Sequence, residues 1–298
     1  MSYYPLISMM PKTPAFVGLL DTYSGAAAAY SLRRLSSTYT GSCIRVRRAN
    51  NNVEQDIGFV NNVVDTATMN TFLAGSGGGY VTKIYDQSGN GRDVAQTTAT
   101  KQMLIYDYNI GLYSLNGKTA MQSSGNAGMG FSVANFPGAT SYSISSVFSA
   151  KDEGWYTKLL SIGPDATNSG VWYTVRTAGT ALGWVTGDTG LAGNGYNNSP
   201  RIISNGQIIP NSDTTQNILL GVLSSTNAKM YRNGSQISYR VNTTGNCYNT
   251  TDTLIVGNAP NGVNTFSGYL QELVIWQSDQ NSNASGINSN TNSYWGTY

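Results

Sequence analysis

The chain has 298 residues, of which 11% are charged, and 17 Lys and Arg against 15 Asp and Glu give it a net charge of +2. A balance this close to neutral provides no overall field of the kind that dominates nucleic-acid binding. The chain contains no histidine, which excludes Ser-His-Asp and Cys-His catalysis and zinc sites with histidine ligands. The length suits one large β domain or two modest ones.

The N-terminal segment, residues 1–20, is predicted to be an arm. It contains three prolines and no consistent hydrophobic period, so we expect it to attach the protein to a partner. Its opening residues have no basic region and no apolar stretch of useful length, so we expect no secretory signal and synthesis in a cytoplasm. No apolar run approaches the roughly 18 residues that a membrane-spanning helix needs, so we expect no membrane insertion.

Two short helices are predicted in the first third of the chain. The segment AAAAYSLRRL is rich in helix formers and follows Ser24, a candidate N-cap. In DTATMNTFLAG, a helix is expected from Asp65 or Thr66 as the N-cap to Gly75 at the C-terminal end.

Between these two segments, CIRVRR predicts a half-buried strand. Its arginines alternate with Ile44 and Val46, which is typical of a solvated strand face, and we expect Glu54 and Asp56 as their partners. The alternative is a phosphate-binding patch formed by Arg33, Arg34, Arg45, Arg47 and Arg48. Because the net charge is small, we favour the strand and expect no nucleic-acid partner.

The stretch KIYDQSGNGRDVAQ, residues 83–96, is predicted to be a strand that ends in a polar turn. Asp86, Ser88 and Asn90 occupy alternate positions before a glycine, as the first ligands of an EF-hand loop do. These three residues are therefore a weak candidate for a calcium site. Thr97 stands where the closing glutamate is required, and strand formers precede the loop, so we favour Asx and glycine turn chemistry.

From about residue 103 onward, strand and turn signals alternate. Runs such as YSISSVFSAK, GVWYTVRTAG, NILLGVLSS and FSGYLQELVIW are each bounded by turn residues, and Asn233-Gly234 predicts a tight hairpin. Short strands at this spacing favour an all-β, concanavalin A-like or laminin-G-like antiparallel β-sandwich (jelly roll) with a few short helices. The polar C-terminal segment is expected to form a helix that docks Ile287 and its aromatic tail on the body.

The two cysteines, Cys43 and Cys247, lie far apart and have no metal-ligand spacing. Two free, buried thiols are favoured over one long-range disulfide. We expect no cofactor and no bound metal, the weak calcium candidate aside.

Glycoside hydrolysis would need two carboxyl groups about 5 to 9.5 Å apart. The sequence has only three glutamates, Glu54, Glu153 and Glu272. Glu153, in AKDEGW, is expected at a solvated hairpin tip, and Glu272 is expected on the exposed face of a final strand.

A cluster of aromatic and polar residues is the candidate sugar site. Aromatic rings stack on sugars, while carboxylates and amides hydrogen-bond to hydroxyl groups. The candidate residues are Trp155, Trp172, Tyr173, Trp184, Asp188, Asn194 and Tyr196, with Asn197 as a further amide. The alternative is that these aromatic residues belong to the core.

Two segments carry a resemblance to a known family. YSLRRLSSTYTGSCIRVRR and YDQSGNGRDVAQ, within residues 28–97, resemble the beginning of the catalytic domain of the family 54 α-L-arabinofuranosidases. The second half, with MYRNGSQI, VGNA and FSGYLQELVIW, is similar to laminin-G or concanavalin-like lectin modules. The combination, with its SDQ segment and aromatic tail, resembles modules of bacteriophage virion proteins. The YDQSGNG loop is by this resemblance a structural signature that does not supply the nucleophile.

The resemblance implies a catalytic glutamate on a mid-domain strand and an aspartate after a glycine pair near the last strands. Aligned with that pattern, this chain has Tyr173 at the first position and Ala259 at the second. The adjacent cysteine pair that lines the sugar pocket of those enzymes is absent here. The resemblance therefore implies a shared scaffold without the shared reaction.

We expect a single β-sandwich over residues 21–298, in which 21–100 is the family-54-like portion, 103–276 the lectin-like portion and 277–298 a C-terminal tail. The expected function is that of a non-catalytic bacteriophage virion protein, a capsid decoration, head fibre or tail appendage, that binds cell-surface or environmental glycans. The arm would contact other capsid or tail proteins, and a homo-oligomer, for example a trimer, would raise weak sugar affinity. The alternatives are an active arabinofuranosidase-like hydrolase, which would use Glu153 with Asp188, and a purely architectural capsid protein.

Overall fold

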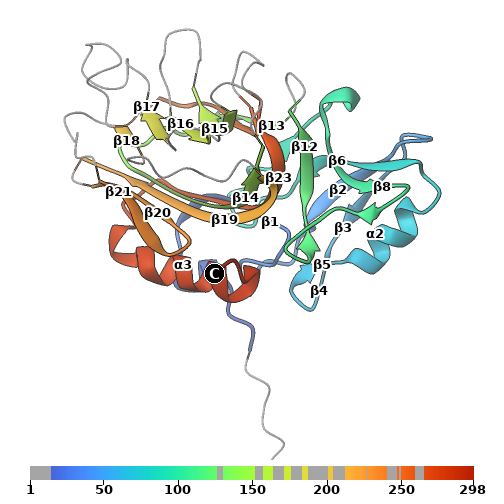
Figure 1. Cartoon of the computed structure of the whole chain (residues 1–298), viewed down its shortest axis with the longest axis horizontal. Coiled ribbons are helices and arrows are strands. Elements are labelled where there is room, and N and C mark those ends of the chain that lie inside the picture. Colours follow the sequence, from blue (N-terminus) through green and yellow to red (C-terminus); the bar gives the residue numbers. More distant parts are fainter. Residues whose placement is uncertain are drawn as a thin grey trace, which may run out of the picture.

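The computed structural model describes residues 15–125, 130–151, 157–163, 171–175, 183–186, 201–203, 212–225, 227–239, 247, 250–258 and 265–298. Within them the strands pair almost entirely antiparallel and form two layers with a smaller sheet beside them (Figure 1). The predicted antiparallel β-sandwich with a few short helices is therefore confirmed. Among the described residues, none of the helices has the length and apolar character needed to cross a membrane.

The first layer is organised around β23. Strand β14 pairs along one edge of β23, while β1 and β12 share the other edge. From β14 the layer continues through β19 and β20 to β21. The strands are β1 (Ala26–Ser31), β12 (Met121–Ser124), β14 (Tyr142–Ala150), β19 (Ser212–Leu223), β20 (Ala228–Arg232), β21 (Ser235–Tyr239) and β23 (Ser267–Trp276).

The second layer runs in the pairing order β7, β13, β22, β15, β16, β17 and β18. Its strands are β7 (Val94–Ala95), β13 (Phe131–Phe136), β15 (Thr157–Ile162), β16 (Val171–Val175), β17 (Gly183–Thr186), β18 (Arg201–Ile203) and β22 (Asp252–Val256). In Figure 1 this layer lies on the opposite side of the first layer from the C-terminal helix.

The third sheet lies beside the sandwich and is built from the N-terminal third of the chain (Figure 1). Its pairing order is β3, β2, β6, β8 and β9. Strand β8 also pairs with β12 at one position, Leu104 with Gln122. The strands are β2 (Ile44–Arg48), β3 (Glu54–Ile57), β6 (Gly78–Ile84), β8 (Met103–Asp107) and β9 (Gly111–Leu112). Two short hairpins, β4 (Phe59–Val60) with β5 (Val63–Val64) and β10 (Ser114–Leu115) with β11 (Lys118–Thr119), and the 3-10 turns η1 (Ala99–Lys101) and η2 (Asn281–Asn283) complete the described elements.

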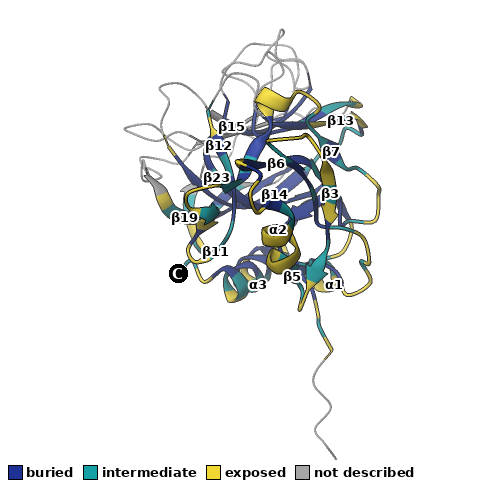
Figure 2. Ribbon diagram, turned by 90° about the vertical axis from the view of Figure 1, so that its right-hand side faces the viewer, coloured by how far each residue is buried: buried dark blue, intermediate teal, exposed yellow. Residues whose placement is uncertain are grey.

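Buried apolar side chains form one large core and one smaller cluster. The large core joins the three sheets and contains side chains such as Tyr30, Phe148 and Phe266. The smaller cluster lies between the outer face of the first layer and the helices α1 (Leu19–Thr22) and α3 (Ala284–Trp295). Figure 2 shows the central strands as buried and the outer side of α2 (Thr66–Leu73) as exposed.

The predicted helix at residues 65–75 is confirmed. The Asp65 carboxylate accepts a hydrogen bond from the Thr68 amide at 3.0 Å and so caps α2. Beyond the helix, Gly75 adopts the left-handed conformation that commonly ends helices. Met69 and Leu73 form the buried side of this helix.

The helix predicted after Ser24 is wrong, because Ala26–Ser31 form the strand β1. All six of its residues are buried, and β1 pairs with β23 along its length. Alanine's helix propensity is a fraction of a kcal/mol per residue, whereas pairing and burial between neighbouring elements contribute more in total.

The predicted C-terminal helix is confirmed as α3, with Ile287 and Trp295 both buried. The residues between β23 and this helix contact the start of β14, where the alternating pattern would leave Ser143 on a solvated face. Ser143 donates to the carbonyl of Ser278 and is completely buried.

The last residues of the segment 1–20, which was predicted to be an arm, are packed against the body. Leu19 is completely buried, and the amide of Leu20 donates to the carbonyl of Leu35 at 2.8 Å. A Cβ at Gly18 would lie 2.1 Å from that same carbonyl oxygen, so the chain packs closely there as well. The packed body therefore begins by Gly18, and residues 1–14 lie outside the described residues.

Two further sequence predictions are confirmed. Asn233 and Gly234 connect β20 to β21 with φ angles of 48° and 77°, the left-handed values that a tight hairpin turn requires. Cys43 and Cys247 are free and buried.

Candidate carbohydrate-binding site

Strands β16 and β17 bring together three of the seven predicted sugar-site residues. The pairing register places Tyr173 opposite Trp184, and Trp172 opposite Val185. Directly paired residues have Cα atoms about 4.5 to 5.5 Å apart, so two predicted aromatic positions are immediate neighbours on adjacent strands. The other four predicted residues, Trp155, Asp188, Asn194 and Tyr196, lie outside the described residues.

The same layer carries the two positions that the family resemblance assigns to catalytic carboxylates. Tyr173 pairs with Leu160 of β15, and Leu160 in turn pairs with Val256, the last residue of β22. Ala259 follows that end of β22 in the sequence and lies outside the described residues. One strand, β15, therefore separates β16, which carries the first position, from β22, which leads to the second. The residues at the two positions are tyrosine and alanine.

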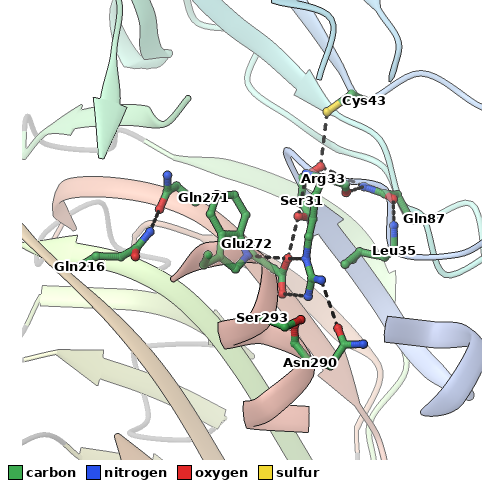
Figure 3. Close-up of polar contacts among 11 residues, drawn as sticks. Ser31, Arg33, Leu35, Cys43, Gln87, Gln216, Gln271, Glu272, Asn290 and Ser293 are labelled. Carbon is green, nitrogen blue, oxygen red and sulfur yellow. Dashed lines mark hydrogen bonds and ion pairs between the residues drawn. The ribbon is translucent and has the colours of Figure 1, made fainter. Parts of the chain in front are cut away.

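Glu272, predicted to lie on an exposed strand face, is instead buried, and that prediction is wrong. Its Oε2 accepts hydrogen bonds from Ser31 Oγ at 2.8 Å, Arg33 Nε at 2.7 Å and Trp295 Nε1 at 3.0 Å. Its Oε1 accepts from Arg33 Nη2 at 3.0 Å. Arg33 also donates to Asn290 Oδ1, so the ion pair connects β1, β23 and α3 (Figure 3).

This arrangement gives the Glu272 carboxylate a structural role. The glutamate side chain is 0% exposed and the arginine side chain 7% exposed. Both carboxylate oxygens are occupied by donors from the protein, so neither can protonate a leaving group or attack a sugar. The next residue along the strand, Gln271, is engaged in the same way, because its amide nitrogen donates to the carbonyls of Leu115 and Lys118.

The remaining glutamates do not complete a catalytic pair within the described residues. Glu54 is exposed on β3, whereas Glu153, predicted at a hairpin tip, lies outside the described residues. No cluster of three or more cysteine or acidic side chains suited to a metal ion occurs among the residues that the structure describes.

The YDQSGNG loop is built around a buried carboxylate. Asp86 Oδ1 accepts from the amides of Ala29 and Ser88, each at 2.9 Å. Asp86 Oδ2 accepts from Ser88 Oγ at 2.7 Å and from the amide of Arg92 at 3.0 Å. Asn90 presents its amide nitrogen to the carbonyl of Ala26. The Asp86 carboxylate and the Ser88 hydroxyl are therefore engaged in the loop's own hydrogen bonds, and Asn90 contributes its amide nitrogen to the loop.

The neighbouring Gln87 connects this loop to β1. Its amide nitrogen donates to the carbonyls of Ser31 and Arg33, and its oxygen accepts from the amide of Leu35 at 2.8 Å. β1 pairs with β23 on one side only, and the loop satisfies backbone groups on its other side. The loop therefore protects the open edge of a buried strand.

The five arginines of the alternative phosphate-binding interpretation each have hydrogen-bond partners within the protein. Arg45 pairs with Asp56 at 2.6 Å, as predicted, on a partly exposed surface. Arg48 donates to the carbonyl of Ala74, and Arg34 to that of Ser36. Arg47, predicted to be solvated, is only 8% exposed.

Sequence reasoning missed a cleft of about 460 Å³ next to Arg47. It is lined by Arg47, Ala49, Tyr80, Ala99, Thr100, Gln102, Leu104 and Ser124. These residues come from β2, β6, β8, β12 and the neighbouring turns, and only the strand register brings them together. No pattern within a single strand marks the cleft, because β2 and β12 contain no aromatic residue and β6 and β8 contain one tyrosine each.

A family model described as "Alpha-L-arabinofuranosidase B, catalytic" matches residues 21–149. This includes and extends the segment that carried the predicted resemblance. No curated protein sequence matches the chain. The lectin-like and bacteriophage parts of the resemblance stay predictions.

Solved structures show the same fold. A GH54 α-L-arabinofuranosidase soaked with a cyclic sulfate inhibitor has 15% identity and a TM-score of 0.61, over 92% of this chain and 64% of that chain. An arabinofuranosidase complexed with arabinofuranosyl-α-1,2-xylobiose has 16% identity and a TM-score of 0.52 over the same shares of the two chains. The binding domain of Paraclostridial Mosquitocidal Protein 1 has 16% identity and a TM-score of 0.51, over 71% of this chain and 50% of that chain.

The class of fold is thus an arabinofuranosidase-like antiparallel β-sandwich. The chain spans 64% of the length of the arabinofuranosidases it resembles. At these identities the likeness concerns the fold alone.

Proposed function

We propose that the protein is a non-catalytic glycan-binding protein built on an arabinofuranosidase-like scaffold. The observation that carries this proposal is that the one buried glutamate among the described residues is enclosed by protein donors and that neither position assigned to a catalytic carboxylate holds an acidic residue. Glu272 is enclosed by Ser31, Arg33 and Trp295, and the two positions that the resemblance assigns to catalytic carboxylates are Tyr173 and Ala259. A scaffold of this kind without its pair of carboxyl groups retains the capacity to bind sugar and loses the means to cleave it.

The proposed binding surface is the β15–β17 edge of the second layer. The pairing of Tyr173 with Trp184 supports it, because adjacent aromatic residues suit stacking against sugar rings. Trp155 precedes β15 and Asp188 follows β17 in the sequence, so both extend from the same strands. Asn194 and Tyr196 belong to the segment after β17 and would supply further hydrogen bonds and stacking.

Proton NMR with a panel of oligosaccharides, including arabinofuranosides, tests this proposal. We expect saturation transfer to at least one oligosaccharide and no new anomeric signals. A Trp184→Ala variant should weaken binding about 3- to 10-fold, as expected for one stacked ring. Tyr108→Ala is the matched control, since Tyr108 is a 66% exposed aromatic residue on a different hairpin. Saturation transfer that is equal in both variants would exclude this surface.

A second candidate is an active arabinofuranosidase-like hydrolase, which the family-model match favours. Its carboxyl groups would be those of Glu153 and Asp188. New anomeric signals in the same NMR tube would support it. A Glu153→Gln variant should then lose several orders of magnitude in rate, and an unchanged rate would remove Glu153 from the mechanism.

We further propose that the protein is displayed on a bacteriophage particle and attached through its N-terminal residues. The low charge content and the arm-like segment support this proposal. Because Leu19 is buried, the appropriate truncation removes residues 1–14 only. Loss of incorporation into particles, with an unchanged unfolding midpoint, is the expected result. Normal incorporation would contradict the attachment, and incorporation without any sugar binding by the intact protein would favour a purely architectural role.

A further inference from the structure

We propose that the cleft next to Arg47 is a second ligand site, which binds the carboxylate of an acidic sugar. It lies on the third sheet, and four strands (β7, β13, β22 and β15) separate β6 from β16 along the chain of strand pairings. The cleft is therefore distinct from the β15–β17 surface. The proposal for the cleft does not depend on the proposal for that surface.

Arg47, Tyr80 and Leu104, which line the cleft, belong to a row of paired residues that continues to Gln122 of the fourth strand. The register pairs Arg47 of β2 with Tyr80 of β6, Tyr80 with Leu104 of β8, and Leu104 with Gln122 of β12. Paired residues project from the same face of a sheet. The row thus presents a cation, an aromatic ring, an aliphatic side chain and an amide in sequence.

The electrostatics of Arg47 point to an anionic ligand. Its Nε donates to Gln102 Oε1 at 2.8 Å, and its Nη1 donates to Asn52 Oδ1 at 2.6 Å. Both partners are neutral, although the arginine is only 8% exposed. Within the described residues it forms no ion pair, even though Glu54 stands opposite it in the register of β2 and β3.

The other buried arginine of the fold makes the contrast clear. Arg33, whose side chain is 7% exposed, has a carboxylate partner in Glu272. Buried charges are normally paired in this way, because desolvating a charge without a partner costs several kcal/mol. Arg47 is therefore a buried guanidinium that lines an open cleft and has room for a counter-ion from outside the chain.

The arginine is held ready for such a ligand. Gln102, which is 3% exposed, fixes Nε and itself donates to the carbonyl of Gln96. Asn52 adopts a left-handed conformation, with φ of 60°, in the turn that holds its oxygen against Nη1. The guanidinium also lies 4.8 Å from the centroid of the Tyr80 ring. Restraints from three sides fix the direction of the guanidinium before a ligand arrives.

Three polar groups that line the cleft have no hydrogen-bond partner among the described residues. They are Arg47 Nη2, the Tyr80 hydroxyl and the Thr100 hydroxyl. Nη1 also donates to the carbonyl of Arg48 at 3.4 Å, so the Nη2 hydrogens are the ones left for a ligand. One cation with these donors matches a monoanionic carboxylate, whereas a phosphate dianion would need more positive charge. The two hydroxyl groups match sugar hydroxyls, and Leu104 with the Tyr80 ring offers an apolar surface to a sugar ring.

The test is an amide-shift NMR titration of the full chain with trigalacturonate, N-acetylneuraminic acid, maltotriose and acetate. We expect trigalacturonate or N-acetylneuraminic acid to shift the amide signals of Tyr80 and Thr100, and the two acids distinguish a uronic from a nonulosonic sugar. Maltotriose has no carboxylate and acetate has no ring, so both should bind at least about 10-fold more weakly. Equal shifts with acetate or maltotriose would overturn the assignment.

Two variants make the site itself falsifiable. Arg47→Met removes the charge and should weaken binding of the acidic sugar about 10-fold or more. Thr100→Trp, at an exposed position on the rim, should fill the cleft and weaken binding even if Arg47→Met fails to fold. Trp184→Ala should leave this binding unchanged, which separates it from the β15–β17 surface. Unaltered binding in Thr100→Trp would refute the site.

Discussion

Replacement of Glu272 by glutamine is the most direct test of the structural role assigned to this carboxylate. The change preserves size and shape but removes the negative charge and one of the two acceptor oxygens. The native carboxylate accepts four hydrogen bonds, two of them from Arg33. In the variant, an amide NH₂ group must face a donor, and the Arg33 guanidinium loses its counter-ion in a site where it is 7% exposed.

The magnitude follows from the two charged hydrogen bonds. Each hydrogen bond to a charged group contributes about 1.5 to 3 kcal/mol, and removal of one partner of a buried ion pair costs about 3 to 5 kcal/mol. We therefore expect Glu272→Gln to lower the free energy of unfolding by about 3 to 5 kcal/mol. Replacing both partners, as in Arg33→Met with Glu272→Leu, removes the uncompensated charge and should be less destabilising than the single change.

Urea unfolding followed by far-UV circular dichroism and tryptophan fluorescence measures this difference. The matched control is Asp56→Asn, which breaks the Arg45–Asp56 pair, whose side chains are 39% and 38% exposed. A surface pair of this kind contributes about 0 to 1 kcal/mol. If Glu272→Gln costs no more than Asp56→Asn, the reasoning about the buried network is refuted.

Four further predictions address other parts of the fold. Burial raises the pKa of Cys43 well above its usual value and that of Cys247 to about 12, so a disulfide reagent at about pH 8 should label neither thiol before unfolding; rapid native labelling would contradict this. Partial burial opposes ionisation of Asp279, but hydrogen bonds outweigh it and lower its pKa. Its stabilising effect is thus present above its unfolded pKa of about 3.9 and lost as the pH falls through the lower folded value. The difference in urea midpoint between wild type and Asp279→Asn should shrink below about pH 4, and a constant difference would refute the assignment. Because Asp86 is fully engaged, about 1 mM calcium should not shift the thermal midpoint, and a clear rise would indicate a bound ion. Gly234→Ala should cost about 1 kcal/mol or more, since φ is 77° and the new Cβ would lie 2.6 Å from a tyrosine hydroxyl; an unchanged urea midpoint would contradict it.

The elements that sequence reasoning predicted well are those whose signals lie within a few residues. The Asp65 cap and Gly75 delimit α2 locally, and Asn233-Gly234 determines a hairpin by its own backbone preference. Ile287 marks the buried side of a helix that is otherwise polar. In each case the chemistry of the residues and the local backbone agree.

The failures arose where a distant partner determines the outcome. The alanine run at residues 26–29 has the composition of a helix, but β23 on one side and the Asp86 loop on the other make it a buried strand. Glu272 follows the alternation of an exposed position, yet Arg33, 239 residues away, supplies the charge that allows its burial. No local pattern contains that information. The cleft at Arg47 was missed for the same reason, because it depends on the register of four strands.

The YDQSGNG loop has a structural role that does not depend on any reaction. Asp86 and Gln87 satisfy backbone groups of β1 and the residues that follow it, so these side chains are required for the packing of the first layer whatever the protein binds. The family-model match covers residues 21–149 and contains this loop. The positions that the resemblance assigns to catalysis, Tyr173 and Ala259, lie beyond its end. The match therefore follows the part of the chain that stabilises the sandwich. A substitution such as Asp86→Ala should thus lower stability by about 1 to 3 kcal/mol for each unsatisfied buried donor, while sugar affinity measured on the folded fraction stays unchanged.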